Sequence, residues 1–428
     1  MRTAVPVRTL ALVGCLAAHT YGQPSATDLL RRVQTRVAES LDRLPRYMCT
    51  LSIDRKVYRR NQGGTGSTVC DDTGSQRTLI SSDRLRLDVA KSNVEMYSWV
   101  GESQFEDRDI IKIVRDGAIS DGTFVALLND IFRTHEATFT YLGDTTENGR
   151  TSSEFGFSVP RQHSLYTFSD GKRSVIVGYS GSFHVDPATG DLLRLTFRTD
   201  RLYPQTSACY LSNVLEYRRV TIAGSDFLLP SESVLHALSL NGLESENQTA
   251  FSNCHQFSGE STISFGPPLE IVARERPTGS QNLGIRARVS FTVALTQGID
   301  TATAAAGDPV TGVLTTPLRE SRKVSIPAGA PVQGRIVEIR QFYGPTSSVR
   351  LRFRLESVEE GGIWLRLSAT PYDGDRIPKA RSGRLQRRMK LGTLPVAQDR
   401  AAEFVFQTAG QRYLVASGLE STWITAAP

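Results

Sequence analysis

The side chains best suited to acid–base chemistry are the histidines, of which the chain has 6 among 428 residues. His184 and Asp186 are two positions apart on a predicted strand and therefore lie on the same face, where they could share a proton or a metal ion. Two ligands are too few for a metal site, and no second pair of Cys or His accompanies Cys254-His255 at zinc spacing. We therefore predict no metal ligands and expect His184 and Asp186 to form an ordinary polar contact in a sheet.

Two serine motifs resemble parts of catalytic sites without meeting their structural requirements. The segment 178–182, GYSGS, lacks the final glycine of a nucleophile elbow and connects two predicted strands, whereas the elbow needs a strand-to-helix turn. Ser169 and Lys172 have S-x-x-K spacing, but the Asp170-Gly171 pair between them predicts a hairpin turn. No phosphate-binding loop or dinucleotide fingerprint is present. The sequence therefore predicts no catalytic residues and no cofactor, and we expect a protein that is not an enzyme.

Residues 1–22 predict a signal peptide. Arg2 and Arg8 form a basic start, 9–18 is a short apolar core, and small residues precede a cleavage position before Gln23. The apolar run is too short to span a bilayer permanently. Alternatively, the segment 12–15, LVGC, is a lipobox in which Cys15 carries a lipid. Both interpretations predict an exported protein, located in the periplasm or cell envelope or secreted.

Four cysteines follow this signal: Cys49, Cys70, Cys209 and Cys254. An even number of cysteines in an exported protein favours disulfide bonds. Three pairings are possible. We favour Cys49–Cys70 with Cys209–Cys254, because each of these pairs encloses one local segment.

A helix should open the mature chain. Ser25 and Asp28 form a capping-box-like start, and Pro45 ends the helix. Its apolar side chains recur at helical spacing on one face: Leu29, Leu30, Val33, Val37 and Leu41. We expect this face to cover a sheet; the alternative is that it lies on a membrane surface.

A long antiparallel meander should follow, because short alternating segments are separated by turn residues. Its central hairpins are 181–199 and 213–233, with turns at 186–190 and 223–226. Other predicted strands are 50–58, 84–89, 94–100, 109–114, 137–142, 153–159, 165–168, 174–179, 234–240 and 259–265. A second helix is predicted at 120–133. The fold class is therefore α+β, a helix packed on an antiparallel sheet.

A second, basic domain is predicted at 284–428, after a linker at 266–283. From Gly266 onwards, 22 Lys and Arg face 14 Asp and Glu, within a total net charge of +6. Alternating strands at 287–295 and 349–355 predict an all-β domain, a small barrel or sandwich. Residues 376–390 form a basic loop without interleaved aromatic residues, so nucleic-acid binding is not expected. Contact with anionic lipid headgroups or with a partner protein is the functional alternative to a plain solvated loop.

The region 25–265 resembles the periplasmic lipoprotein-carrier fold, which the sigma-factor regulatory envelope proteins share. The resemblance rests on the leading helix and on the hairpins VDPATGDLLRLTF (185–197) and YRRVTIAGSDFLLPSES (217–233). The segments LPRYMC (44–49) and FSNC (251–254) also resemble a group of exported bacterial envelope proteins. In these families a curved half-barrel, closed by helices, holds an apolar cavity for acyl chains. No functional residue transfers by position.

This resemblance implies a binding protein of the bacterial envelope. Residues 23–265 would take a lipid, a lipoprotein acyl chain or another apolar ligand, and the C-terminal domain would contact a partner protein or the membrane surface. The first alternative is an exported hydrolase whose acid–base groups come from His184, Asp186 or His163 on distant strands. The second is a structural component of an envelope assembly.

Overall fold

The computed structural model describes residues 25–60, 70, 76–91, 95–101, 118–119, 124–134, 136–147, 149–170, 173–257, 288–320, 323–372, 400–408, 410 and 412–426. Within these residues the fold is mostly β, with two α-helices, α1 (Ala26–Arg43) and α3 (Phe124–Phe132). The predicted signal peptide with Cys15, the strands at 109–114 and 259–265, the linker 266–283 and the basic loop 376–390 lie outside the described residues.

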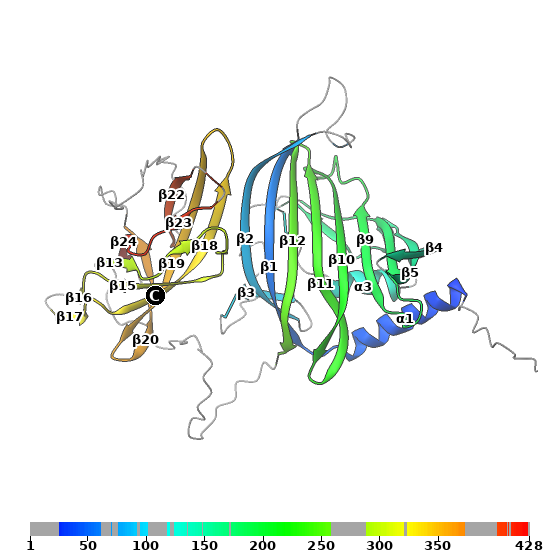
Figure 1. Ribbon diagram of the computed structural model, residues 1–428, viewed down its shortest axis with the longest axis horizontal. Helices are drawn as coiled ribbons and strands as arrows, with labels where there is room; N and C mark the ends of the chain where they lie inside the picture. The colour runs from blue at the N-terminus through cyan, green and yellow to red at the C-terminus, as the bar shows by residue number, and fades with distance from the viewer. Residues whose placement is uncertain are drawn as a thin grey trace, which may run out of the picture.

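A large, curved antiparallel sheet forms the N-terminal part of the molecule (Figure 1). Its strands pair in the order β4–β5–β8–β9–β10–β11–β12–β1–β2. Among the described strands β4 pairs only with β5, so the sheet stays open at that edge. The strands are β1 (Tyr47–Arg60), β2 (Arg77–Lys91), β3 (Glu95–Trp99), β4 (Thr138–Glu147), β5 (Arg150–Val159), β6 (Thr167–Ser169), β7 (Ser174–Ile176), β8 (Tyr179–Val185), β9 (Leu192–Thr199), β10 (Ala208–Ile222), β11 (Ser225–Ser239) and β12 (Leu243–Gln256).

The C-terminal part is built of strands alone among its described residues, and it joins the first sheet at β2. Its main strands pair in the order β22–β19–β18–β15–β13–β24–β21. The strands are β13 (Ser290–Leu295), β14 (Ile299–Asp300), β15 (Pro309–Leu314), β16 (Leu318–Glu320), β17 (Lys323–Ile326), β18 (Pro331–Phe342), β19 (Ser347–Glu360), β20 (Ile363–Arg366), β21 (Ala369–Pro371), β22 (Ala402–Thr408), β23 (Leu414–Val415) and β24 (Glu420–Thr425).

The predicted hairpins are present, because their turn residues and alternation act locally. β8 and β9 flank the 186–190 turn, β10 and β11 flank Ala223-Gly224, and β4 and β5 flank the Asn148-Gly149 position. The segment predicted as a separate strand at 234–240 is instead the second half of the long strand β11. The described part of the second helix spans Phe124–Phe132, within the predicted range 120–133, and residues 120–123 lie outside the described residues.

Strand β12 was not predicted, and its sequence explains why. Its inward positions Asn247, Thr249 and Phe251 are buried, but two of the three are polar. Hydrophobic alternation, the main strand signal, is therefore weak here. Pairing with β11 on one side and β1 on the other makes β12 a central strand nonetheless.

Two apolar clusters lie against the N-terminal sheet. One packs α1 and α3 on β5, β8, β9, β10 and β11, with the fully buried Phe183 in edge-to-face contact with Phe132 of α3 at 5.1 Å between ring centroids. The other packs β1, β2 and β3 with β12 and the ends of β10 and β11. The C-terminal strands have a cluster of their own around Phe353 and Trp423.

The predicted two-domain division is not settled by this arrangement. The clusters are largely separate, but β18 pairs with β2 over Ser81–Asp83, so one sheet runs through both parts. The amide of Arg86 donates to the carbonyl oxygen of Ala306 at 2.7 Å. Asp83 accepts from Arg55 on β1 at 2.6 Å and from Arg340 on β18 at 3.0 Å. The boundary near 266–283 therefore remains a prediction.

Candidate ligand pocket

Helix α1 covers the end of the N-terminal sheet at which the β8–β9 and β10–β11 turns lie (Figure 1). The Ser25 hydroxyl accepts a hydrogen bond from the Asp28 amide at 3.2 Å, which satisfies one orphan donor of the first turn. Leu29, Val33 and Val37 are buried against the sheet, as the spacing predicts. The polar face of the helix remains on the outside.

One polar contact joins α1 to a turn of the sheet, and another joins it to the segment after α3. Arg32 donates from Nη2 to the carbonyl oxygen of Pro187 in the β8–β9 turn at 2.8 Å. Near the other end of the helix, Asp42 forms an ion pair of 3.0 Å with Arg133, which follows α3. These contacts are partly exposed, so each contributes little to stability on its own. Together these contacts fix the position of α1 relative to the sheet and to α3.

A pocket of about 230 Å³ lies between α1, α3 and the ends of β9, β10 and β11. Its apolar lining consists of the aliphatic side chains of Val37, Leu41, Leu128, Leu192 and Leu228. Charged side chains also line it: Arg36, Glu39, Arg43, Asp191, Arg219 and Asp226. The pocket therefore combines aliphatic side chains with groups able to contact a polar head.

Two arginines converge on one carboxylate at this pocket. Asp191 accepts from Arg219 at 2.7 and 2.9 Å and pairs with Arg36 of α1 at 3.3 Å. The hydrogen bond with Asp191 raises the pKa of Arg219, so this guanidinium stays charged throughout the ordinary pH range. The Arg36–Asp191 contact links the helix to the sheet beside the pocket, and movement of α1 away from the sheet would break it.

The tight turn beneath α1 explains the position of Asp186. Its carboxylate accepts hydrogen bonds from the amides of Ala188 at 2.9 Å and Thr189 at 3.1 Å. Burial alone would raise the pKa of Asp186, but these hydrogen bonds and Arg150 outweigh it and lower the pKa. Asp186 therefore stabilises the turn in which Gly190 packs against the Arg32 side chain.

The structure does not join the predicted acid–base candidates into one group. His184 lies 3.7 Å from Glu154 and 3.4 Å from the Ser152 hydroxyl, which are cross-strand contacts on β5. His163 instead lies 3.2 Å from Glu136. Within the described part of the chain, no group of three or more His, Cys, Asp or Glu side chains could hold a metal ion.

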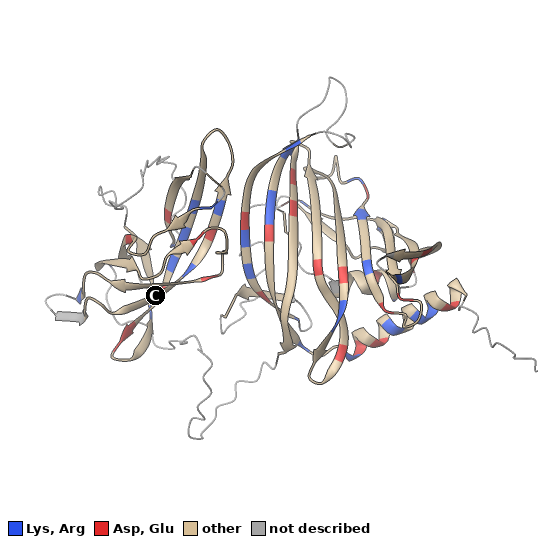
Figure 2. Ribbon diagram, viewed as in Figure 1, with Lys and Arg blue, Asp and Glu red and all other residues tan. Residues whose placement is uncertain are grey.

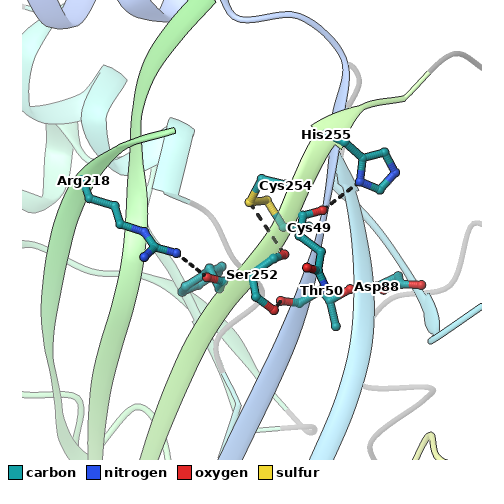
Figure 3. The surroundings of a disulfide bond; sticks show 9 residues. Cys49, Thr50, Asp88, Arg218, Ser252, Cys254 and His255 are labelled. Carbon is teal, nitrogen blue, oxygen red and sulfur yellow. Dashed lines mark hydrogen bonds between the residues drawn. A yellow bond between two sulfur atoms is a disulfide. The ribbon is translucent and has the colours of Figure 1, made fainter. Parts of the chain in front are cut away.

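The disulfide pairing differs from the favoured prediction. Cys49 is bonded to Cys254, and Cys70 is bonded to Cys209. Figure 3 shows Cys49 on β1 joined to Cys254 on β12, beside Thr50 and Ser252. The favoured pairs, Cys49–Cys70 and Cys209–Cys254, are wrong because the sheet brings the first and last strands of the meander together, and a bulge opposite Cys49 places Cys254 beside it.

Asp130 of α3 is a buried carboxyl group that the sequence did not single out. It accepts hydrogen bonds at Oδ2 from the Leu165 amide at 2.9 Å and from the Tyr179 hydroxyl at 3.1 Å. Burial raises the pKa of Asp130, and these hydrogen bonds oppose the rise only in part. The side chain attaches α3 to β8. A polar residue within a short apolar helix was the only sequence signal.

No family model matches the chain, and no curated protein matches it. Several solved structures are similar to the chain. One is a putative outer membrane lipoprotein-sorting protein domain from Vibrio parahaemolyticus. Its sequence identity to this chain is 11%, the match covers 54% of this chain and 93% of that chain, and the TM-score is 0.28. A DUF1329 family protein from Desulfovibrio piger has 11% identity, 55% and 94% coverage and a TM-score of 0.27. A LolA superfamily protein from Nitrosomonas europaea has 11% identity, 54% and 94% coverage and a TM-score of 0.25.

These neighbours include the class of protein to which the sequence resemblance assigned residues 25–265. TM-scores this low carry nothing about ligand or activity, so a function for this chain has to rest on its own residues. In the described residues, no helix combines the length and the apolar character needed to cross a membrane.

Proposed function

We propose that the N-terminal part of this protein binds the apolar chain of a lipid, or of a lipid-modified protein, in the pocket under α1, and that it does so without catalysis. The observation that carries the proposal is the pocket itself, whose lining includes five aliphatic side chains from α1, α3, β9 and β11 together with charged side chains. An apolar site with a few polar groups is typical of binding sites for small apolar ligands.

The size of the pocket limits what it holds. Its volume of about 230 Å³ is below the roughly 300–1,000 Å³ of pockets for drug-sized ligands. It therefore fits one end of a chain rather than a whole lipid. Burial contributes about 0.8 kcal/mol for each methylene, so a short chain segment contributes several kcal/mol before the cost of association.

The charged side chains suit a ligand with a polar head. Arg36, Arg219 and Asp191 form hydrogen bonds and ion pairs beside the aliphatic lining. A head group can therefore stay hydrated or form hydrogen bonds with these side chains while its chain is buried. Two disulfides are typical of exported proteins and support a role in the periplasm or envelope.

Replacement of the aliphatic lining tests the proposal. The double variant Leu41→Gln/Leu228→Gln places two amide groups in the lining, and their desolvation opposes binding of a chain. We expect at least a tenfold increase in the Kd for dansyl-labelled undecanoic acid, measured by fluorescence titration. Circular dichroism and the Tm of each variant establish that it is folded.

The matched control is Leu414→Gln, which changes a leucine that is 63% exposed on the C-terminal part. It should bind the probe as the wild type does. Unchanged binding by the folded double variant, or equal loss in the control, would contradict a ligand site under α1.

A further inference from the structure

The end of the sheet opposite the α1 pocket forms a second distinct surface. We call it the distal end and define it by residues 160–170, 173–178, 200–207 and 240–242. Its segments are bonded to one another: Arg173 donates to the carbonyl oxygen of Gln205 at 2.9 Å, and the Leu240 amide donates to the carbonyl oxygen of Ser207 at 2.9 Å. Val177, Leu202 and Ala208 form a small apolar cluster beneath them. The distal end is therefore an ordered unit.

Large aliphatic side chains are exposed on this unit. Leu165 is 65% exposed, Ile176 49% and Leu240 43%. Thr167 pairs with Ile176 in the β6–β7 hairpin, so Leu165, two residues before Thr167, lies on the same side of the hairpin as Ile176. Burial of aliphatic surface by a partner or by lipid would stabilise association.

Cationic side chains occur in the same segments as the exposed aliphatic groups. The exposed arginines of the distal end are Arg161, Arg173 and Arg201. Two acids lie in the same segments: Asp170 is hydrogen bonded to the amide and hydroxyl of Ser207, and Asp200 is exposed. Figure 2 shows how Lys and Arg, and Asp and Glu, are distributed over the strands of the sheet. Among its described residues the distal end therefore has three arginines and two acids, a small excess of positive charge beside the exposed aliphatic side chains.

We propose that the distal end docks on an anionic lipid bilayer, with Leu165 and Ile176 entering the interface and the arginines contacting headgroups. Positive charge complements anionic lipids, and a bilayer accepts separate aliphatic side chains without a shaped partner surface. Protein interfaces are instead enriched in aromatic residues at a closely packed centre. Docking at this end leaves the α1 pocket at the opposite end of the sheet, facing away from the membrane.

Vesicle flotation tests the docking surface. Wild-type protein should float with vesicles of 30% phosphatidylglycerol in phosphatidylcholine and not with phosphatidylcholine alone. Leu165→Ser/Ile176→Ser should reduce binding at least fivefold. The matched control is Ile363→Ser/Leu414→Ser, which removes aliphatic side chains that are 59% and 63% exposed on the C-terminal part; it should bind as the wild type does.

Insertion is tested separately with Ile176→Trp, compared with Leu414→Trp. Only the first should show a blue-shifted emission and quenching by brominated lipid chains, after subtraction of the wild-type spectrum. Absence of wild-type binding, equal binding by the hairpin variant, or quenching at position 414 alone would overturn the proposal. Leu41→Gln/Leu228→Gln should float with the anionic vesicles as the wild type does, and this result separates docking at the distal end from binding of a lipid chain under α1.

Discussion

Gly307 lies at a contact between the two parts of the chain. It has a φ of +105°, and a Cβ atom at this position would lie 2.1 Å from the carbonyl oxygen of Arg86 and 3.1 Å from the Trp99 ring. The first contact is with backbone in β2, so no side-chain rotation relieves it. Only glycine is compatible with both the backbone angle and the contact.

We expect Gly307→Ala to destabilise the protein by about 2 kcal/mol or more, through backbone strain and steric overlap. The matched control is Gly418→Ala, since Gly418 has a φ of +83° but a Cβ atom added there would have no neighbour within 4 Å. A shift of the thermal unfolding midpoint, measured by calorimetry, should be clearly larger for position 307. Equal shifts would show that the close approach to β2 does not form in solution.

At the scale of the elements, the disulfides and β12 show what local sequence patterns omit. Hairpins such as β8–β9 were predictable because both strands and their turn are contiguous. The Cys49–Cys254 bond spans 205 residues and Cys70–Cys209 spans 139. Such disulfide pairings depend on which distant strands become neighbours in the sheet. The turn sequences between strands do not predict these neighbours. The favoured local pairing was wrong for that reason.

Removal of the β1–β12 bond by Cys49→Ser/Cys254→Ser should cost about 2–5 kcal/mol of stability, the usual range for a native disulfide. Removal of Cys70–Cys209 should cost a similar amount, because loop-closure entropy depends only weakly on the number of residues enclosed. Denaturant unfolding measures both variants. Peptide mapping without reduction gives the control, and a peptide joining Cys49 to Cys70 would contradict the arrangement of β12 beside β1.

At the scale of the whole molecule, one sheet carries two surfaces at opposite ends. The covering helix and the apolar face beneath it were predictable from the spacing of Leu29, Val33 and Val37. The pocket was not, because Asp191, Arg219 and Leu228 come from separate segments of the sheet and share no spacing. The pairing of β2 with β18 was not predictable either, because the two strands are far apart in the sequence and no local pattern relates them.

The central claim is that this protein carries an apolar chain under α1. The most direct measurement is native mass spectrometry of the protein purified gently from its native host, followed by solvent extraction. We predict a discrete additional mass that extracts as lipid and that is absent from Leu41→Gln/Leu228→Gln. A chain without bound mass, which stays so after lipids are added, would contradict the claim.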